Sequence, residues 1–206
     1  LGHIYNCITM AFSFPEHNIL IVTKQDAIEG LKKIKSTNLP YMMIRNDYDI
    51  DDVIEKFKPD IWVNDCLDTN KEYIEFLKTK IGRVVTIEDL GEGRNYADAV
   101  INAIYDASDN DKVVQANQYW GSEYICLREE FLLSEPKTFS EKVNNILIMF
   151  GGTDPSNLNF KLYKLILKIA DEYNDIKFNF IICTNTNNTT VKPKSKKSTR
   201  YTKLTC

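Results

Sequence analysis

Short apolar runs alternate with amphipathic segments along most of this chain of 206 residues. The runs NILIVT at 18–23 and DIWVND at 60–65 have the length and the β-branched content of buried strands. The segments that follow, such as 25–36 and 70–80, place apolar side chains at helical spacing. This alternation predicts an α/β fold built on a parallel, doubly wound sheet.

The same pattern gives an expected position for each element. We expect helices at 2–12, 25–36, 51–58, 70–80, 127–133 and 158–173. We expect strands at 18–23, 41–45, 60–65, 83–87, 99–103, 146–150 and 176–183, and a loop at 105–118.

Composition divides the chain into four parts. Residues 1–133 are predicted to form a first α/β domain that lacks its first strand, because a helix starting at residue 2 needs a preceding strand to pack against. Residues 134–144 are an expected linker, and 145–183 open a second α/β unit with a single βαβ repeat. Residues 184–206 have almost no apolar side chains, which predicts a disordered basic tail. Two ends that look incomplete indicate a fragment, or a degenerate or frameshifted copy, of something longer.

Charge and cysteine content narrow the class of protein. The net charge is −3, but residues 184–206 hold six bases and no acid, which leaves 20 basic and 29 acidic groups, or −9, in residues 1–183. This excess of acidic groups in residues 1–183 argues against nucleic-acid binding. No apolar run is long enough for a membrane span, and the first residues lack the basic region of a signal peptide. Five scattered cysteines without a CxxC pair indicate reduced thiols and a cytoplasmic location.

A glycine turn between a strand and a helix is the first candidate binding element. In NILIMFGGTDPSN, Gly151, Gly152 and Thr153 follow an apolar run, and Asp154 is placed to cap the next helix. Free backbone N–H groups at a helix start favour a phosphate. The alternative is an ordinary turn whose glycines only allow the bend.

A second group of candidates gathers at the expected carboxyl edge of the sheet. His3, preceded by Gly2, opens the first helix and is placed to act as a base on a ligand in the crevice there. Asp65 and Asp68 follow a buried strand and are candidates for binding sugar hydroxyls or orienting the histidine. The alternatives are a surface histidine near a frayed end and a capping role for Asp68.

The segment EDLGEG, which contains Glu88 and Asp89, also follows a strand. Its carboxylates and glycines suit a ligand loop, and a solvated turn is the alternative. The spacing fits no calcium-binding loop, so we predict no metal site. Arg128, beside two acids, is typical of a structural ion pair, and no Ser or Cys lies in a nucleophile-elbow context.

Five motifs appear in a fixed order: GHIYNCITMA, a strand ending at Asp65, EDLGEGRNYADAVINAIY, YICLREEF and ILIMFGGTDPSN. Together they resemble the UDP-sugar hydrolases of pseudaminic acid biosynthesis, which are relatives of the two-Rossmann-domain (GT-B) glycosyltransferases. The nearest subgroup is that of spore-coat polysaccharide biosynthesis proteins, where the module often follows an acylneuraminate cytidylyltransferase domain. The resemblance runs from Gly2 to Ile182.

The resemblance implies a reaction and assigns roles in it. Water deprotonated by His3 would attack a UDP-amino sugar, with Gly151, Gly152, Thr153 and Asp154 near the diphosphate. No cofactor is implied, and a fused or associated cytidylyltransferase is an expected partner. The chain departs from the family where Asn6 replaces an arginine and Cys66 a tyrosine, and the uridine-binding half would lie after residue 183.

Two further functions stay open at this stage. A GT-B glycosyltransferase would use the same fold with an acceptor hydroxyl in place of water. An inactive fragment or accessory module of a cytidylyltransferase fusion is the non-enzymatic alternative.

Overall fold

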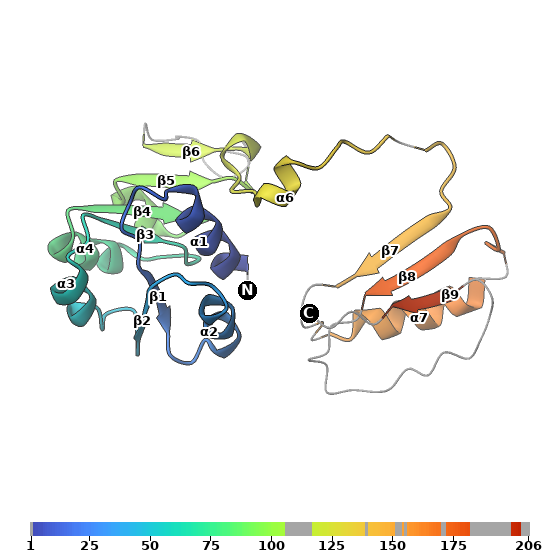
Figure 1. Ribbon diagram of the computed structural model, residues 1–206, viewed down its shortest axis with the longest axis horizontal. Helices are drawn as coiled ribbons and strands as arrows, with labels where there is room; N and C mark the ends of the chain where they lie inside the picture. The colour runs from blue at the N-terminus through green and yellow to red at the C-terminus, as the bar shows by residue number, and fades with distance from the viewer. Residues whose placement is uncertain are drawn as a thin grey trace. The chain divides into compact units, whose positions relative to one another are not determined.

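A computed structural model describes residues 2–105, 117–138, 140–150, 154, 156–169, 172–181 and 199–202. Contacts divide the chain into two compact units, residues 1–134 and 135–206. In each unit parallel strands alternate with helices, as Figure 1 shows. The predicted α/β class, Rossmann-like in its parallel sheets, is therefore confirmed.

The first unit follows the predicted alternation of strands and helices closely. Its elements are α1 (Gly2–Ser13), β1 (Ile21–Lys24), α2 (Ile28–Lys35), β2 (Tyr41–Ile44), α3 (Asp51–Phe57), β3 (Ile61–Asn64), α4 (Lys71–Lys80), β4 (Arg83–Ile87), the 3-10 helix η1 (Glu92–Tyr96), β5 (Ala99–Asn102), β6 (Gln118–Trp120), the 3-10 helix η2 (Ser122–Tyr124) and α6 (Glu129–Leu132).

The strands of this unit form two parallel sheets rather than one. β1 pairs with β2, and a four-stranded sheet has the order β3, β4, β5, β6 (Figure 1). In register, Ile21 lies opposite Tyr41, and Asn64 lies opposite Thr86. Because all these pairs run parallel, the strands of each sheet deliver their carboxyl ends to one edge, where loops lead into the next helix.

One hydrophobic core joins the two sheets of the first unit. Ile44 from β2 packs in the same buried cluster as Val84 from β4 and Val100 from β5. Helix α4 contributes Ile74 and Leu77, which point the same way because helical neighbours lie three or four residues apart. Burial of these side chains, rather than intrinsic propensity, holds such short elements in place.

Several boundaries in the structure differ from the predicted ones; the strand predicted at 18–23, for example, is Ile21–Lys24. Helix α2 starts at Ile28 because the preceding residues form a tight turn, in which Ala27 N donates to Lys24 O at 3.1 Å. Helix α7 is described over Leu158–Ile169, whereas the predicted helix continues to residue 173, and residues 170–171 lie outside the described residues. Gln118 opens strand β6, whereas the sequence predicts a loop there, and residues 106–116 of that loop lie outside the described residues.

Strand β6 was hard to predict because it is only three residues long. Gln118 is buried opposite Val100 of β5, and Val100 N donates to Asn117 O at 3.0 Å. Such a short, partly polar run shows no alternation, so pairing with the edge of β5 decides its conformation.

The second unit is a smaller α/β layer. It contains β7 (Asn145–Met149), α7 (Leu158–Ile169), β8 (Lys177–Ile181) and β9 (Thr199–Thr202), with strand order β7, β8, β9. Its core consists of Ile148, Tyr163, Ile166, Phe178 and Phe180. Tyr163 of α7 meets Phe180 of β8 edge to face at 5.8 Å between ring centroids, which fixes the helix on this face of the sheet.

Strand β9 lies in the segment for which the sequence predicts disorder. Residues 199–202 pair in parallel with β8, Phe178 lying opposite Thr199. The remaining residues of 184–206 lie outside the described residues. Thr and Tyr favour strands, and pairing also covers an edge of β8, so a context-dependent strand can form where composition predicts none.

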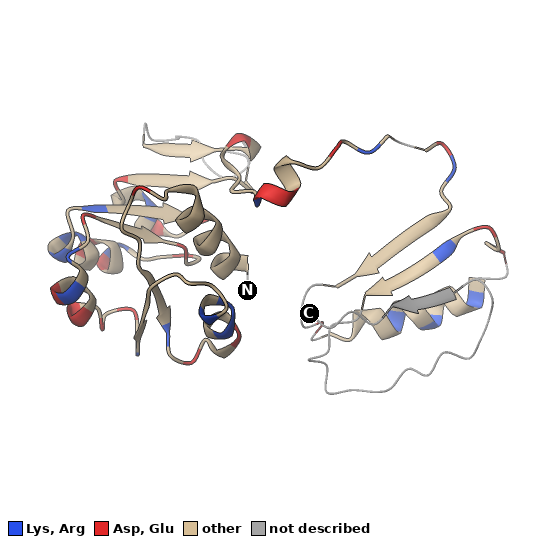
Figure 2. Cartoon of the chain, in the orientation of Figure 1, with Lys and Arg blue, Asp and Glu red and all other residues tan. Residues whose placement is uncertain are grey.

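Charged side chains are unevenly placed on the described elements. Figure 2 shows Lys, Arg, Asp and Glu gathered on α2, α3 and α4, whereas α1 has none of them. Within the part of the chain that the structure describes, no helix has the length and apolar character needed to cross a membrane.

The amino end of α4 gives a direct test of this local structure. The Asn70 side chain accepts a hydrogen bond from Tyr73 N at 2.9 Å and caps the helix. We expect Asn70→Ala to lower the free energy of unfolding by roughly 1 kcal/mol, because one helix N–H loses its acceptor. Asn70→Asp, which keeps the acceptor, should retain stability in the same chemical denaturation experiment. Equal losses in both variants would contradict the capping role.

Candidate functional site

His3 and Asp65 meet at the carboxyl edge of the first unit. His3 lies in the first turn of α1, and Asp65 comes directly after the last residue of β3. His3 Nδ1 is 2.6 Å from Asp65 Oδ1. The imidazole is 46% exposed and the carboxylate only 2% exposed. Residues 62 positions apart therefore form a pair in which a buried carboxylate holds a solvent-accessible imidazole.

This contact determines which nitrogen of His3 is available for chemistry. When Nδ1 donates its proton to Asp65, the lone pair of the imidazole is on Nε2. A carboxylate in this position orients the ring and stabilises the positive charge that forms when Nε2 takes up a proton. The pair has the arrangement of a general base and its orienting group.

Side chains from one face of α1 lie against the Asp65 carboxylate. Cys7 Sγ lies 3.9 Å from Asp65 Oδ2, and the side chain of Asn6 acts to lower the pKa of the same carboxylate. Burial raises the pKa of Asp65, whereas the hydrogen bonds and charge of His3, and the bonds of Asn6 and Cys7, act to lower it. Burial dominates, so Asp65 ionises less readily than an ordinary aspartate.

The cysteines near this pair are poorly suited to nucleophilic chemistry. Burial, followed by the charge of Asp65, raises the pKa of Cys7 to about 12. Burial is also the main cause of the raised pKa values of Cys66 and Cys126. At neutral pH these thiols stay protonated, and the thiolate is the form that reacts. His3 is therefore the better candidate for the reacting group.

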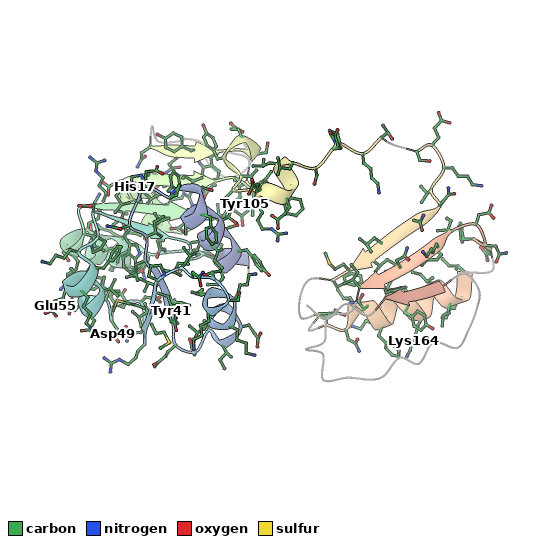
Figure 3. All side chains as sticks on the ribbon, in the orientation of Figure 1. His17, Tyr41, Asp49, Glu55, Tyr105 and Lys164 are labelled. Carbon is green, nitrogen blue, oxygen red and sulfur yellow. The ribbon has the colours of Figure 1, made fainter. Side chains whose placement is uncertain are left out.

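The second histidine of the chain has a different environment. His17 follows the end of α1, is labelled in Figure 3, and has a 3.4 Å contact with Glu16 on the surface. Both partners of that contact are well exposed. Exposed pairs of this kind contribute little to stability and do not hold the imidazole in one orientation. His17 therefore serves as a natural control for His3.

Glu88 and Asp89 lie at the same sheet edge, but their carboxylates are used within the protein. Glu88 Oε1 accepts from Ala103 N at 3.0 Å. Asp89, which is fully buried, accepts from Thr69 N at 3.0 Å, from the Thr69 hydroxyl and from Gly91 N at 2.9 Å. These bonds join the turn after β3 to the turn after β4. Both acids are thus bonded within the protein, and their predicted place in a ligand loop stays a prediction.

Asp68 lies in the turn between β3 and α4. Its side chain is exposed and its φ is 53°, a left-handed conformation that aspartate tolerates better than most residues. None of the contacts found among the described residues joins it to His3. Asp68 therefore stays a predicted binding residue, and it follows Asp65 in the same loop between β3 and α4.

Asp154 caps the first turn of α7. Its Oδ1 accepts from Leu158 N at 2.7 Å, and its Oδ2 accepts from Asn159 N at 2.9 Å. The side chain is buried, so its predicted capping role occupies both carboxylate oxygens. Gly151, Gly152 and Thr153, the predicted phosphate-binding turn, lie outside the described residues.

The sequence analysis named His3 as a partner of Asp65 but missed Asn6 and Cys7. His3, Asn6 and Cys7 are spaced i, i+3 and i+4, which places them on one helix face, and this spacing was visible in the sequence. Arg128 packs over the Tyr5 ring at 5.6 Å and over Phe131 at 4.9 Å, which the sequence could not show. Among the described residues no group of three or more His, Cys, Asp and Glu could hold a metal ion.

The geometry thus defines an α/β protein with a carboxylate-oriented histidine at the carboxyl edge of its parallel strands. No family model matches the chain. It is similar to "Uncharacterized protein MJ1062" of Methanocaldococcus jannaschii, 28% identical over 187 residues, which cover 84% of this chain and 38% of that protein. It is also similar to "Spore coat polysaccharide biosynthesis protein SpsG" of Bacillus subtilis, 35% identical over 129 residues, covering 60% of this chain and 37% of that protein. The chain therefore spans less than two fifths of either relative.

The contact between the two turns at this edge can be tested through Gly91. A Cβ added there would lie 2.6 Å from the carbonyl carbon of Asp68 and from the backbone nitrogen of Thr69. We expect Gly91→Ala to destabilise the first unit by about 1–3 kcal/mol through overpacking against backbone that cannot move away. At Gly82 an added Cβ would meet only Asp60 O at 3.6 Å, so Gly82→Ala should be close to neutral. Denaturation curves that do not separate the two variants would contradict the close packing.

Proposed function

We propose that this chain is a module of surface or spore-coat polysaccharide biosynthesis that acts on a nucleotide-activated amino sugar. The similarity to a spore coat polysaccharide biosynthesis protein supports the biosynthetic class. The contact of 2.6 Å between His3 and Asp65 is the observation that carries the proposed chemistry. The chain spans only part of the length of its relatives, so the substrate and the activity of the whole protein are proposed here.

The proposed reaction is hydrolysis at the anomeric carbon of the sugar. His3 Nε2 takes a proton from water as the water oxygen forms a bond to the anomeric carbon. The bond between that carbon and the diphosphate oxygen breaks, and the electron pair leaves with the nucleoside diphosphate. Asp65 stabilises the imidazolium that results, as buried carboxylates do in other histidine-base sites. The products are a free sugar and a nucleoside diphosphate.

The roles of the remaining candidates follow from their positions. Asp68, exposed next to the pair, is proposed to contact sugar hydroxyls or amides. The turn with Gly151, Gly152 and Thr153, ahead of helix α7, is proposed to bind the diphosphate through backbone N–H groups and the positive helix end. The fully buried Asp89 is better assigned to holding the edge together than to touching substrate.

A glycosyltransferase would use the same pair to deprotonate an acceptor hydroxyl instead of water. The exposed imidazole accommodates either nucleophile, so the two reactions are separated by their products. Release of free sugar from a UDP-amino sugar without an acceptor supports hydrolysis. Turnover that requires an added sugar or lipid acceptor supports transfer. A module that serves only as an accessory to a cytidylyltransferase would give neither product.

The base is tested by comparing the two histidines. The assay uses a protein that contains this chain and hydrolyses a UDP-sugar. In it, we expect His3→Ala to lower kcat by roughly two to four orders of magnitude, the usual contribution of general acid–base catalysis. Substrate binding should change little, because the diphosphate is held elsewhere. His17→Ala, which removes an exposed histidine past the end of α1, should keep wild-type kcat. Wild-type turnover in His3→Ala would refute the proposed base.

The role of Asp65 is tested by measuring turnover and stability together. Asp65→Asn keeps the shape but cannot stabilise an imidazolium, so we expect kcat to fall by roughly 10²-fold or more. Burial raises the pKa of Asp65 in the folded protein, so its ionisation opposes folding as the pH rises through that pKa. The Asn variant should therefore be at least as stable as wild type at neutral pH, and this advantage should disappear in acid, where Asp65 is protonated in both states.

Thermal denaturation across this pH range gives the second readout. A variant that loses turnover yet keeps its Tm identifies Asp65 as a positioning residue for His3. A large drop in Tm at neutral pH would instead make the carboxylate a structural anchor, and the pairing with His3 would then have no catalytic meaning.

A further inference from the structure

The first turn of helix α1 is held on two sides. On one side, His3 Nδ1 contacts Asp65 Oδ1 at 2.6 Å. Tyr5 follows two residues later, and two helical steps rotate a side chain by about 200°, so Tyr5 leaves the helix on the side away from His3. Two cations meet the Tyr5 ring there, with Lys33 Nζ at 5.0 Å and Arg128 Cζ at 5.6 Å from the ring centroid. The turn that carries the imidazole therefore lies between a carboxylate and a ring that two cations contact.

This turn depends on outside contacts more than the rest of α1 does. The first four N–H groups of a helix have no intrahelical acceptor, so the first turn opens at a low cost in free energy. His3 is one of the residues of that turn. Contacts on the far side of the helix keep the turn closed, and a closed turn keeps the imidazole at Asp65.

Arg128 comes from a segment that is anchored to the four-stranded sheet. Directly after strand β6, Gly121 N donates to Asn102 O of β5 at 3.1 Å. The chain then passes through η2, and its backbone is extended at Ile125 and at Arg128, where α6 begins (Figure 1). The guanidinium is therefore carried by a short connection whose start is bonded to the sheet.

The same segment passes close to the pair formed by His3 and Asp65. Burial, followed by the charge of Asp65, raises the pKa of Cys126, so this thiol lies within electrostatic reach of the carboxylate. Two residues later, Arg128 lies over Tyr5 on the other side of the helix. The segment thus reaches both sides of the first turn of α1.

A guanidinium suits this position better than an ammonium would. Arg128 lies 4.9 Å from the Phe131 ring as well as over Tyr5, so one planar cation joins α6 to α1. Its 3.6 Å contact with Glu130 joins two exposed side chains, and exposed ion pairs contribute little. The aromatic contacts therefore fix the position of Arg128 more than the ion pair does.

We propose that Arg128 is a positioning residue that acts on His3 through Tyr5. By holding the Tyr5 ring it keeps the first turn of α1 closed. The closed turn keeps His3 Nδ1 on Asp65 and leaves Nε2 free to accept a proton. The catalytic meaning of this role rests on the proposed function, whereas the holding of the imidazole does not.

The tautomer of His3 tests this role in the full chain without a substrate. Nitrogen-15 NMR of the imidazole, at a pH at which the ring is neutral, separates the Nδ1–H form from the Nε2–H form. We expect Arg128→Ala to lower the ratio of Nδ1–H to Nε2–H by roughly two- to fivefold, the equilibrium factor of one exposed cation–π contact. Tyr5→Phe keeps the ring and should match wild type. Arg45→Ala, which removes an arginine paired with Asp49 on the surface, is the matched control and should also match wild type.

Turnover and stability separate positioning from two other roles. In a protein that contains this chain and hydrolyses a UDP-sugar, Arg128→Ala should lower kcat and leave KM nearly unchanged. An unchanged His3 tautomer overturns the proposal. Together with a raised KM it would mean that Arg128 binds substrate, and together with a lowered Tm it would mean that Arg128 only stabilises the fold. A shifted tautomer with unchanged turnover would support the positioning of the ring and would refute His3 as the base.

Discussion

A buried carboxylate that must find hydrogen-bond donors organises the functional edge of the first unit. Asp89 has no access to water, so the free energy of leaving its charge unpaired would be large. It is stabilised by donors from Thr69 and Gly91, which hold the turn after β3 against the turn after β4. Asp65 lies at the start of the first of these turns. The position of the carboxylate that contacts His3 therefore depends on Asp89, whose own oxygens are bonded within the protein.

The order of strands and helices could be predicted because burial imposes it on the sequence. The apolar runs that became β3 and β4 are continuous, and α4 repeats its buried residues at helical spacing. Strand β6 could not be predicted in this way, because a run of three residues with Gln118 at its start has too little pattern. Residues 199–202 escaped prediction for a similar reason, since their pairing partner, β8, and not their own composition, makes them a strand.

The sequence could predict where the candidate residues lie along the chain, but not which groups they bond to. A parallel sheet brings the ends of its strands to one edge, so the sequence could place His3, Asp65 and Glu88 together. It could not show which carboxylates are bonded to backbone, because that depends on which backbone N–H groups lie within reach. Glu88 and Asp89 are bonded to such N–H groups, whereas Asp65 is bonded to side chains of α1. The spacing of His3, Asn6 and Cys7 is the signal that separates the two cases.

The long sequence separation between His3 and Asp65 also has a kinetic consequence. Their contact closes a loop of 62 residues that contains β1, β2 and the helices between them and β3. The entropy of closing so long a loop must be offset by the core to which the loop contributes, in which Ile44, Ile50 and Val53 meet. The pair should therefore assemble late in folding and separate early in unfolding, after most of the first unit has already condensed. Its integrity reports on the cooperative packing of that whole unit, because no local segment of the chain can form it alone.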